Sequence, residues 1–310
     1  MTKPFLNYEN QISKLKNKGL TIEDENYAVS VLKKYSYYRL ITGYKTIFKN
    51  PVNQLYYRGV KIEDIVALYD FDQNLRDVFL KYLIQHEKTL GSHISYYFSE
   101  KYGNHQNAYL YHSNFDTTGN YSRKLPRLIS MLNKMATGSD HDYAYIHHYQ
   151  KKYSNVPLWV LVNALTMGTK SVMFNVLTQE LKASIAKEFH VNPKELSQMN
   201  HVATKFRNTC AHGERLYNKR VNESISDLPI HRKLDISKVN GQYIKGKSDL
   251  FSVVILLKYL LSKEDFKMLK KEIIKKINLY LKSTSFITKN DLLDMMGFPY
   301  NWERITRYKK

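Results

Sequence analysis

The feature that most constrains the fold is a helical period that runs through residues 62–101. Apolar side chains recur there at the spacing of one face of an α-helix. The residues that set the period are Ile62, Ile65, Val66, Tyr69, Leu75, Phe79 and Leu83. The pattern predicts either one very long helix or two helices in line, with a kink near Gly91.

Further helical patterns follow one another along most of the chain. Thr21 is expected to cap the second helix of the chain. Pro157 and Pro193 are expected to open two later helices, the first of which should break at Gly168. The patterns cover residues 8–18, 21–35, 125–135, 158–177, 193–212, 249–261 and 263–281.

Two polar regions interrupt the helical patterns. Residues 103–120 are rich in Asn, His and Thr and predict a loop, whereas residues 213–247 predict an irregular insertion with short strands. We therefore expect an all-α fold. Its parts would be an N-terminal helical extension over 1–60, a helical domain over 61–285 that includes the insertion, and a small C-terminal element over 286–310.

The charge of the chain favours a polyanionic partner. Lys and Arg number 48 against 28 Asp and Glu, so the formal net charge is +20. Nucleic acid is the first candidate and an acidic membrane the second, and the alternative is a Lys-rich bias spread over solvated faces. The 26 tyrosines fit nucleic acid, because a tyrosine beside a lysine can stack on an unpaired base. Alternatively, most of these tyrosines are half-buried residues of helices.

Cysteine content and apolar runs indicate a cytoplasmic protein without a membrane partner. Cys210 is the one cysteine, so no disulfide can form within the chain. The first residues lack the apolar core of a signal peptide. The longest apolar runs, 156–167 and 250–261, are too short or too interrupted to span a bilayer.

The strongest chemical signal lies at the end of the helix predicted over 193–212. Arg207, Asn208 and His212 fall within six residues. Arginine binds phosphate through a planar fork of donors, and histidine can give or take a proton near neutral pH. Together they suffice to cleave a phosphodiester without a metal, although a structural role for this spacing is the alternative.

Helix geometry separates a core face from a polar face in the helix predicted over residues 193–212. At about 100° per residue, one face carries Met199, Val202, Ala203, Phe206 and Cys210. The opposite face carries His201, Lys205, Asn208 and His212. Arg207 lies on the flank, where desolvation of an unpaired guanidinium is costly. It therefore needs a partner, either an acidic side chain or a substrate phosphate.

Four segments resemble known protein families. Residues 207–212 resemble the signature of HEPN-superfamily ribonucleases, which is an Arg, a polar residue, three further residues and a His. The longer segment 206–218 is similar to the Abi-like family of abortive-infection proteins, of the AbiD/AbiF type. Residues 37–44, 69–76 and 296–302 resemble three further blocks of that family, in the expected order. Gly213 departs from the commonest form, which has a His or a small polar residue there.

The resemblance implies a fold, an activity and partners. The fold would be a HEPN-type helical bundle, and the function antiphage abortive infection by RNA cleavage. Cleavage would need neither metal nor cofactor. HEPN nucleases pair two motifs across a dimer, so the single motif here implies a homodimer. A structured noncoding RNA would be a second RNA partner besides the substrate.

The resemblance also implies roles for particular residues. His212 would act as general acid or base, Arg207 would hold the scissile phosphate, and Asn208 would orient one of them. Glu87 is a candidate partner of Arg207 or His212, with an ordinary helix glutamate as the alternative. His201 and Lys205 would support the site. Candidate RNA-binding residues are Tyr37, Tyr38, Arg39 and Arg215.

Competing readings remain. His147 and His148 are adjacent and point to different helix faces, and His141 lacks a ligand spacing, so no metal site is expected. A non-catalytic RNA-binding module and a phage-sensing interaction protein on the same fold are the alternatives to an enzyme. The intact Arg207, Asn208 and His212 favour the enzyme.

Overall fold

The structure, a computed structural model, describes residues 4–138 and 143–309 and is all-α apart from one small hairpin. Its main axis is α3 (Ile62–Tyr102), which continues through Gly91 as a single helix. At about 1.5 Å per residue it is roughly 60 Å long. The expected all-α class is therefore confirmed, and of the two alternatives for residues 62–101 the single helix is correct.

Local sequence accounts for the ends of α3. Asp64 accepts a hydrogen bond from the Lys61 backbone N–H at 2.9 Å and so satisfies a donor at the N-terminus. At the other end Gly103 adopts a φ of +84°, and its N–H donates to the Ser99 carbonyl at 2.8 Å. The apolar side chains of α3 are buried around much of its circumference, because other helices pack along the whole axis.

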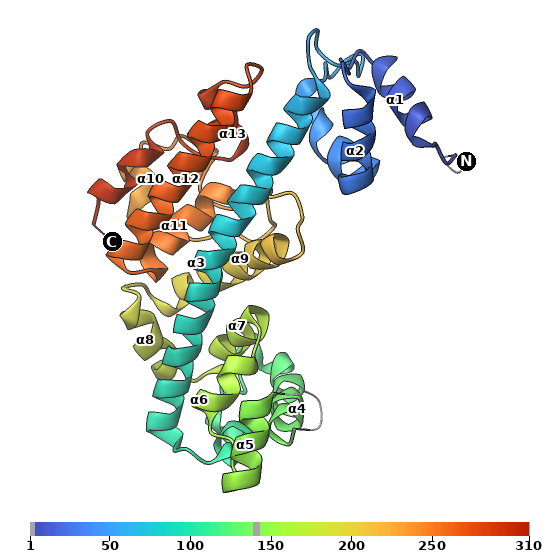
Figure 1. The fold of residues 1–310 in the computed structure, drawn as a ribbon. Coiled ribbons are helices and arrows are strands. Elements are labelled where there is room, and N and C mark those ends of the chain that lie inside the picture. Colours follow the sequence, from blue (N-terminus) through green and yellow to red (C-terminus); the bar gives the residue numbers. More distant parts are fainter. Residues whose placement is uncertain (1–3, 139–142, 310) are drawn as a thin grey trace.

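The remaining helices lie in three groups along α3 (Figure 1). The N-terminal extension, with α1 (Tyr8–Lys16) and α2 (Glu25–Tyr35), sits at one end. The middle packs against α9 (Pro193–Ala211), α11 (Leu250–Leu260) and α12 (Lys263–Ser283). Around the other end lie α4 (Leu125–Ala136), α5 (Ala144–Tyr153), α6 (Leu158–Leu161), α7 (Met167–Val176) and α8 (Gln179–Glu188).

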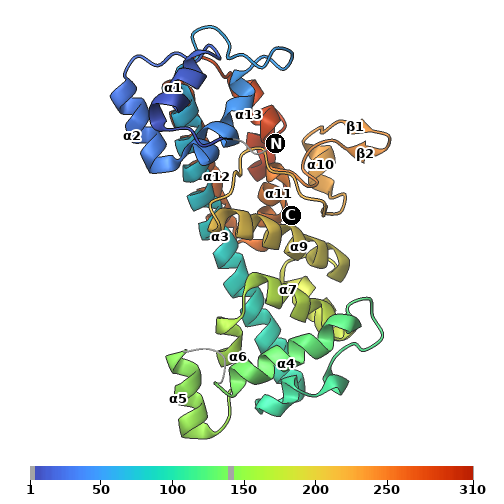
Figure 2. The ribbon, with the colours of Figure 1, turned by 90° about the vertical axis from the view of Figure 1, so that its right-hand side faces the viewer.

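The region after α9 is irregular, as expected, and contains short strands. It holds α10 (Pro229–Lys233) and an antiparallel hairpin of β1 (Lys238–Val239) and β2 (Gln242–Tyr243), visible to one side in Figure 2. The C-terminal element begins with α13 (Lys289–Met295). Its Phe298 ring lies 4.9 Å from Phe251 of α11 and 5.0 Å from the buried Trp302, so the element packs onto the bundle.

Short π-helical and 3₁₀ elements lie between these helices and after the last of them. They are a π-helical turn, Tyr38–Thr42, and the 3₁₀ turns Lys45–Phe48, Gln106–Tyr109, His112–Asn114, Ser122–Lys124, Val162–Ala164 and Trp302–Arg307.

Two predicted helix boundaries are wrong for reasons of capping. Asp24, not Thr21, caps α2, because its carboxylate accepts the Tyr27 N–H at 3.0 Å. Gly168 does not break a helix over 158–177. The chain leaves the helical conformation at Leu165, and the Thr166 hydroxyl caps α7, which places Gly168 in its first turn. The helices α5 and α8 were not predicted.

Candidate active site at the end of α9

The helix α9 begins with a reciprocal capping arrangement. The Asn192 side chain accepts the Glu195 N–H, and the Glu195 carboxylate accepts the Asn192 N–H, both at 2.9 Å. Pro193 is the first helical residue, as predicted. The predicted core face is confirmed, since all five of its residues are buried: Met199, Val202, Ala203, Phe206 and Cys210.

The end of α9 places His212 just outside the helix. His212 is the C-cap residue, and Gly213 follows with a φ of +66°. The Glu214 N–H donates to the Thr209 carbonyl at 3.0 Å, and the Gly213 N–H to the Cys210 carbonyl at 3.2 Å. These two bonds form a Schellman motif, whose left-handed position glycine occupies with little strain. Gly213 thereby ends the helix where His212 can project into solvent.

The side chains of His212 and Asn208 are both exposed. Within residues 4–138 and 143–309, no group hydrogen-bonds the imidazole of His212 or the side-chain amide of Asn208. They share one side of the helix end, because they are four residues apart. Both groups are therefore available to a ligand.

Arg207 is held by a carboxylate of α3. Its Nε donates to Glu87 Oε2 at 3.1 Å, so the expected contact between Glu87 and Arg207 is present. The other oxygen, Oε1, lies 3.9 Å from Nζ of Lys170 on α7. Glu87 and Lys170 are almost fully buried, whereas 26% of the Arg207 side chain is exposed. One carboxylate thus lies between two cations, and the terminal nitrogens of Arg207 have no partner among the described residues.

Lys170 was not predicted as a site residue, although its position in the sequence indicates a buried charge. It is a lone charge beside the mostly apolar run 171–177, and it packs against Gly91 of α3. Burial is the main cause that lowers the pKa of the Lys170 amine, and the nearby Arg207 lowers it further, whereas Glu87 raises it. A buried lysine needs a carboxylate partner, and Glu87 supplies it.

If the protein cleaves RNA and Glu87 positions Arg207 for that reaction, removal of the Glu87 charge should lower both the stability and the cleavage rate, and the two effects should be separable. Glu87→Gln should lower the free energy of unfolding by about 1–3 kcal/mol, since two cations lose their shared partner. It should slow cleavage roughly 10- to 100-fold by freeing Arg207. Adding Lys170→Met should restore the melting temperature but not the cleavage rate. Glu100→Gln, on an exposed part of α3, is the matched control. Recovery of cleavage in the double variant would contradict positioning by Glu87.

His201 and Lys205 lie apart from His212. The His201 ring is half-buried, with its Nε2 3.3 Å from the Tyr121 hydroxyl and 3.4 Å from Asn175 Nδ2. Burial lowers the pKa of His201. Lys205 is exposed and its ammonium lies 3.4 Å from Glu223. Neither side chain lines the groove that contains His212.

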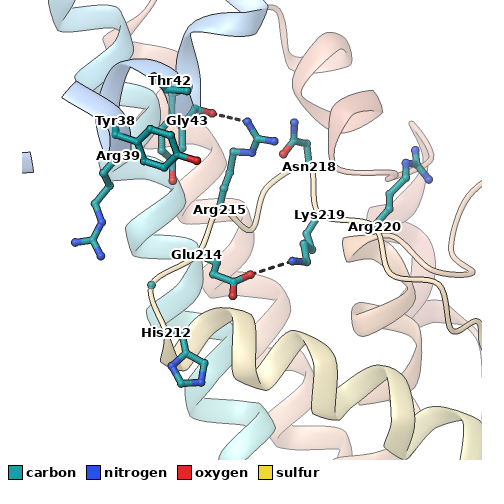
Figure 3. A pocket seen from close by; sticks show the side chains of 12 residues that line it. Tyr38, Arg39, Thr42, Gly43, His212, Glu214, Arg215, Asn218, Lys219 and Arg220 are labelled. Carbon is teal, nitrogen blue, oxygen red and sulfur yellow. Dashed lines mark hydrogen bonds and ion pairs between the residues drawn. The ribbon is translucent and has the colours of Figure 1, made fainter. Parts of the chain in front are cut away.

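An open groove joins the end of α9 to the N-terminal extension (Figure 3). Its volume is about 740 Å³. Tyr38, Arg39 and Arg215 lie in it together with His212, whereas Tyr37 is half-buried and packs against the core. Lys219 and Arg220 also line it and were not predicted. The full lining is Tyr38, Arg39, Thr42, Gly43, Tyr44 and residues 212–215 and 218–220.

A buried aspartate on α3 joins the two walls of this groove. Asp72 accepts the backbone N–H groups of Leu216 and Tyr217, at distances from 2.6 to 3.1 Å. It also accepts the Tyr44 hydroxyl and Nη1 of Arg76, each at 2.6 Å. The segment that follows α9 and the N-terminal extension therefore both bind Asp72, a single residue of α3.

Two buried histidines, His86 and His231, are less suited to proton transfer than His212. His86 is fully buried, with Nε2 2.8 Å from Asn200 Oδ1, and burial lowers its pKa to about 4. Burial also lowers the pKa of His231. His212 differs from both because its ring is exposed on the groove.

Residues 4–138 and 143–309 contain neither a cluster of metal-ligating side chains nor a membrane-spanning helix. In that part of the chain no three His, Cys, Asp or Glu side chains come together as a possible metal site. His141 lies outside the described residues. None of the described helices combines the length and the apolar character that a membrane crossing requires.

Comparison with known proteins places the chain in a family. The model of the family described as Abi-like protein matches residues 30–218, which include the π-helical turn Tyr38–Thr42, Asp72 and Glu87 of α3, and the segment 207–212. No curated protein and no solved structure matches. Because the family model covers more than half of the chain, this protein belongs to the Abi-like family.

Proposed function

We propose that this protein is a cytoplasmic antiphage protein that cleaves RNA as a metal-independent endoribonuclease of HEPN type. Its membership of the Abi-like family supports abortive infection as the biological setting. One observation supports the proposed nuclease activity. An exposed, unpartnered His212 lies at the rim of a cationic groove, five residues after an arginine whose terminal nitrogens have no partner among the described residues.

The proposed reaction needs a base, an acid and a phosphate-binding cation. The RNA 2′-hydroxyl loses its proton to a base and attacks the adjacent phosphate. The bond from phosphorus to the 5′-oxygen breaks, and that oxygen takes a proton from an acid. The products are a 2′,3′-cyclic phosphate and a free 5′-hydroxyl. His212 performs one of the two proton transfers, and Arg207 offsets the charge that develops on the phosphate.

Asn208 and the surrounding charge complete the proposal. Asn208 lies one turn before His212, so its amide can orient the imidazole or the phosphate. The net charge of +20 suits a long polyanion and leaves room for a structured noncoding RNA besides the substrate. Dependence on the 2′-hydroxyl makes RNA, not DNA, the substrate.

The products and the metal requirement test this chemistry directly. Purified protein should convert RNA to fragments that end in a 2′,3′-cyclic phosphate and begin with a 5′-hydroxyl, at an unchanged rate in excess chelator. The same strand made of DNA is the matched control and should remain intact. Loss of cleavage on addition of chelator, with recovery on adding a divalent cation, would overturn the mechanism.

The motif supplies one histidine per chain, whereas the reaction has two proton transfers. We therefore expect a homodimer with His212 of both copies near the two-fold axis. Light scattering at the working concentration should give twice the mass of one 36.6 kDa chain. A monomer that still cleaves RNA would contradict the paired site.

A specific observation favours a second candidate, a non-catalytic RNA-binding module. Arg207 already has a carboxylate partner in Glu87, so its presence can be explained by the fold alone. In that case the groove would bind RNA and His212 would contact it without transferring a proton. Such a protein would bind RNA tightly, with or without chelator, and yield no new ends.

A further inference from the structure

We propose that Tyr38 and Arg39 form a subsite for an unpaired nucleotide beside the phosphate that His212 approaches. The inference rests on the proposed function and deepens it, because it names the RNA conformation that this groove accepts. It also assigns a role to the N-terminal extension, as one wall of the binding site. Binding at the subsite can be measured without cleavage.

The position of Tyr38 supports base stacking. The side chain is 80% exposed, although it lies on a wall that faces a groove. Its backbone begins the π-helical turn Tyr38–Thr42, and the next apolar residues, Leu40 and Ile41, are completely buried. The turn is therefore anchored, and the ring is held at the surface. No ring contact or hydrogen bond to the Tyr38 side chain occurs among the residues that the structure describes.

Charge around Tyr38 supports an anionic ligand. The Arg39 guanidinium has no partner in the described part of the chain, and Figure 3 shows its side chain leaving the same turn as Tyr38. Arg215, Lys219 and Arg220 come from the opposite wall. The only carboxylate among the lining residues is Glu214, and Lys219 lies 3.0 Å from it. Arg220 lies 3.5 Å from the buried Asp249, so the excess positive charge of the groove comes from Arg39 and Arg215.

The two walls are also fixed relative to each other. Nη1 of Arg215 donates to the carbonyl of Gly43, which links the segment after α9 to the end of the π-helical turn Tyr38–Thr42. On the inner side, Asp72 binds Tyr44 and the backbone of Leu216. These contacts fix the relative positions of Tyr38, Arg39 and His212. An RNA strand in the groove would therefore contact all three residues in the same geometry.

This arrangement favours unpaired over paired RNA. A tyrosine can stack only on a base whose face is open, and bases inside a duplex already stack on their neighbours. Phosphate contacts from Arg39 and Arg215 do not distinguish the two forms. The preference should therefore depend on the Tyr38 ring, and the affinity for either form on the arginines.

The test compares binding of one fluorescent oligoribonucleotide, alone and annealed to its complement. His212→Ala serves as background so that RNA stays intact, and fluorescence anisotropy gives the dissociation constants. We expect Tyr38→Ala to weaken binding of the single strand about tenfold or more and to leave duplex binding unchanged. Tyr38→Phe should bind within about twofold of the background protein, because the ring remains. Tyr300→Ala is the matched control, since Tyr300 is 82% exposed and lies outside the groove.

Arg39→Ala separates charge from stacking. It should weaken both RNA forms alike and reduce the slope of log affinity against log salt by about one. Unchanged single-strand binding by Tyr38→Ala, or an equal loss for single strand and duplex, would overturn the subsite. If Tyr38 controls binding but wild-type protein cuts no RNA, the subsite stands and the nuclease proposal fails. If wild-type protein cuts RNA but binding does not depend on Tyr38, the nuclease proposal stands and the subsite fails.

Discussion

Replacing His212 with alanine should reduce the rate of RNA cleavage by about 10²–10⁴-fold, the usual contribution of a general acid or base. The fold should not change, because the ring is exposed and contacts no described residue through a hydrogen bond. The measurement is the initial cleavage rate of purified protein, with thermal melting to confirm folding. His112→Ala is the matched control, since His112 is also exposed and lies outside the groove.

The same variant separates the two candidate functions in cells. A bacterial host that expresses either protein would be challenged with phage, and RNA ends with a cyclic phosphate or a 5′-hydroxyl would be sequenced. Joint loss of protection and of new ends would support catalysis by His212, and the wild-type ends would identify the substrate. Protection that survives without cleavage would instead support the RNA-binding or phage-sensing alternative.

Sequence patterns predicted the long helix and the motif helix well because local rules determine both. The apolar period of residues 62–101 remains regular over many turns, so α3 could be recognised. Asn192, Pro193 and Gly213 set the ends of α9 through capping and a left-handed turn. Where two local signals competed, as at Thr166 and Gly168, the hydroxyl cap determined the boundary.

The site was only partly predictable because its remaining parts come from distant segments. Glu87 was a reasonable candidate for Arg207, since a guanidinium at the edge of a core needs a partner. Lys170 comes from another helix, and nothing in the period of α3 or α9 indicates it. The approach of Tyr38 and Arg39 to His212 depends on tertiary contacts, above all those of Asp72.

Asp72 should therefore be among the most sensitive positions of the fold. Asp72→Ala should lower the free energy of unfolding by about 3–5 kcal/mol, the usual cost of breaking a buried ion pair. Arg76 would lose its carboxylate at 2.6 Å, and the Leu216 and Tyr217 N–H groups would lose their acceptor. Urea denaturation followed by circular dichroism measures the change. Asp70→Ala is the matched control, because Asp70 is half-buried and the hydrogen bond that its carboxylate accepts from the Tyr35 hydroxyl is long at 3.4 Å.

A second variant shows whether charge or the backbone contacts dominate at Asp72. Asp72→Ala with Arg76→Met removes both charges, so it should be more stable than Asp72→Ala alone if the unpaired guanidinium causes most of the loss. If the double variant is no more stable, the unsatisfied Leu216 and Tyr217 N–H groups cause the loss, because an apolar partner cannot accept their hydrogen bonds. A loss below about 1 kcal/mol in Asp72→Ala, the size of a single ordinary hydrogen bond, would show that Asp72 does not hold the groove together. The proposed preference of the groove for unpaired RNA would then need another structural basis.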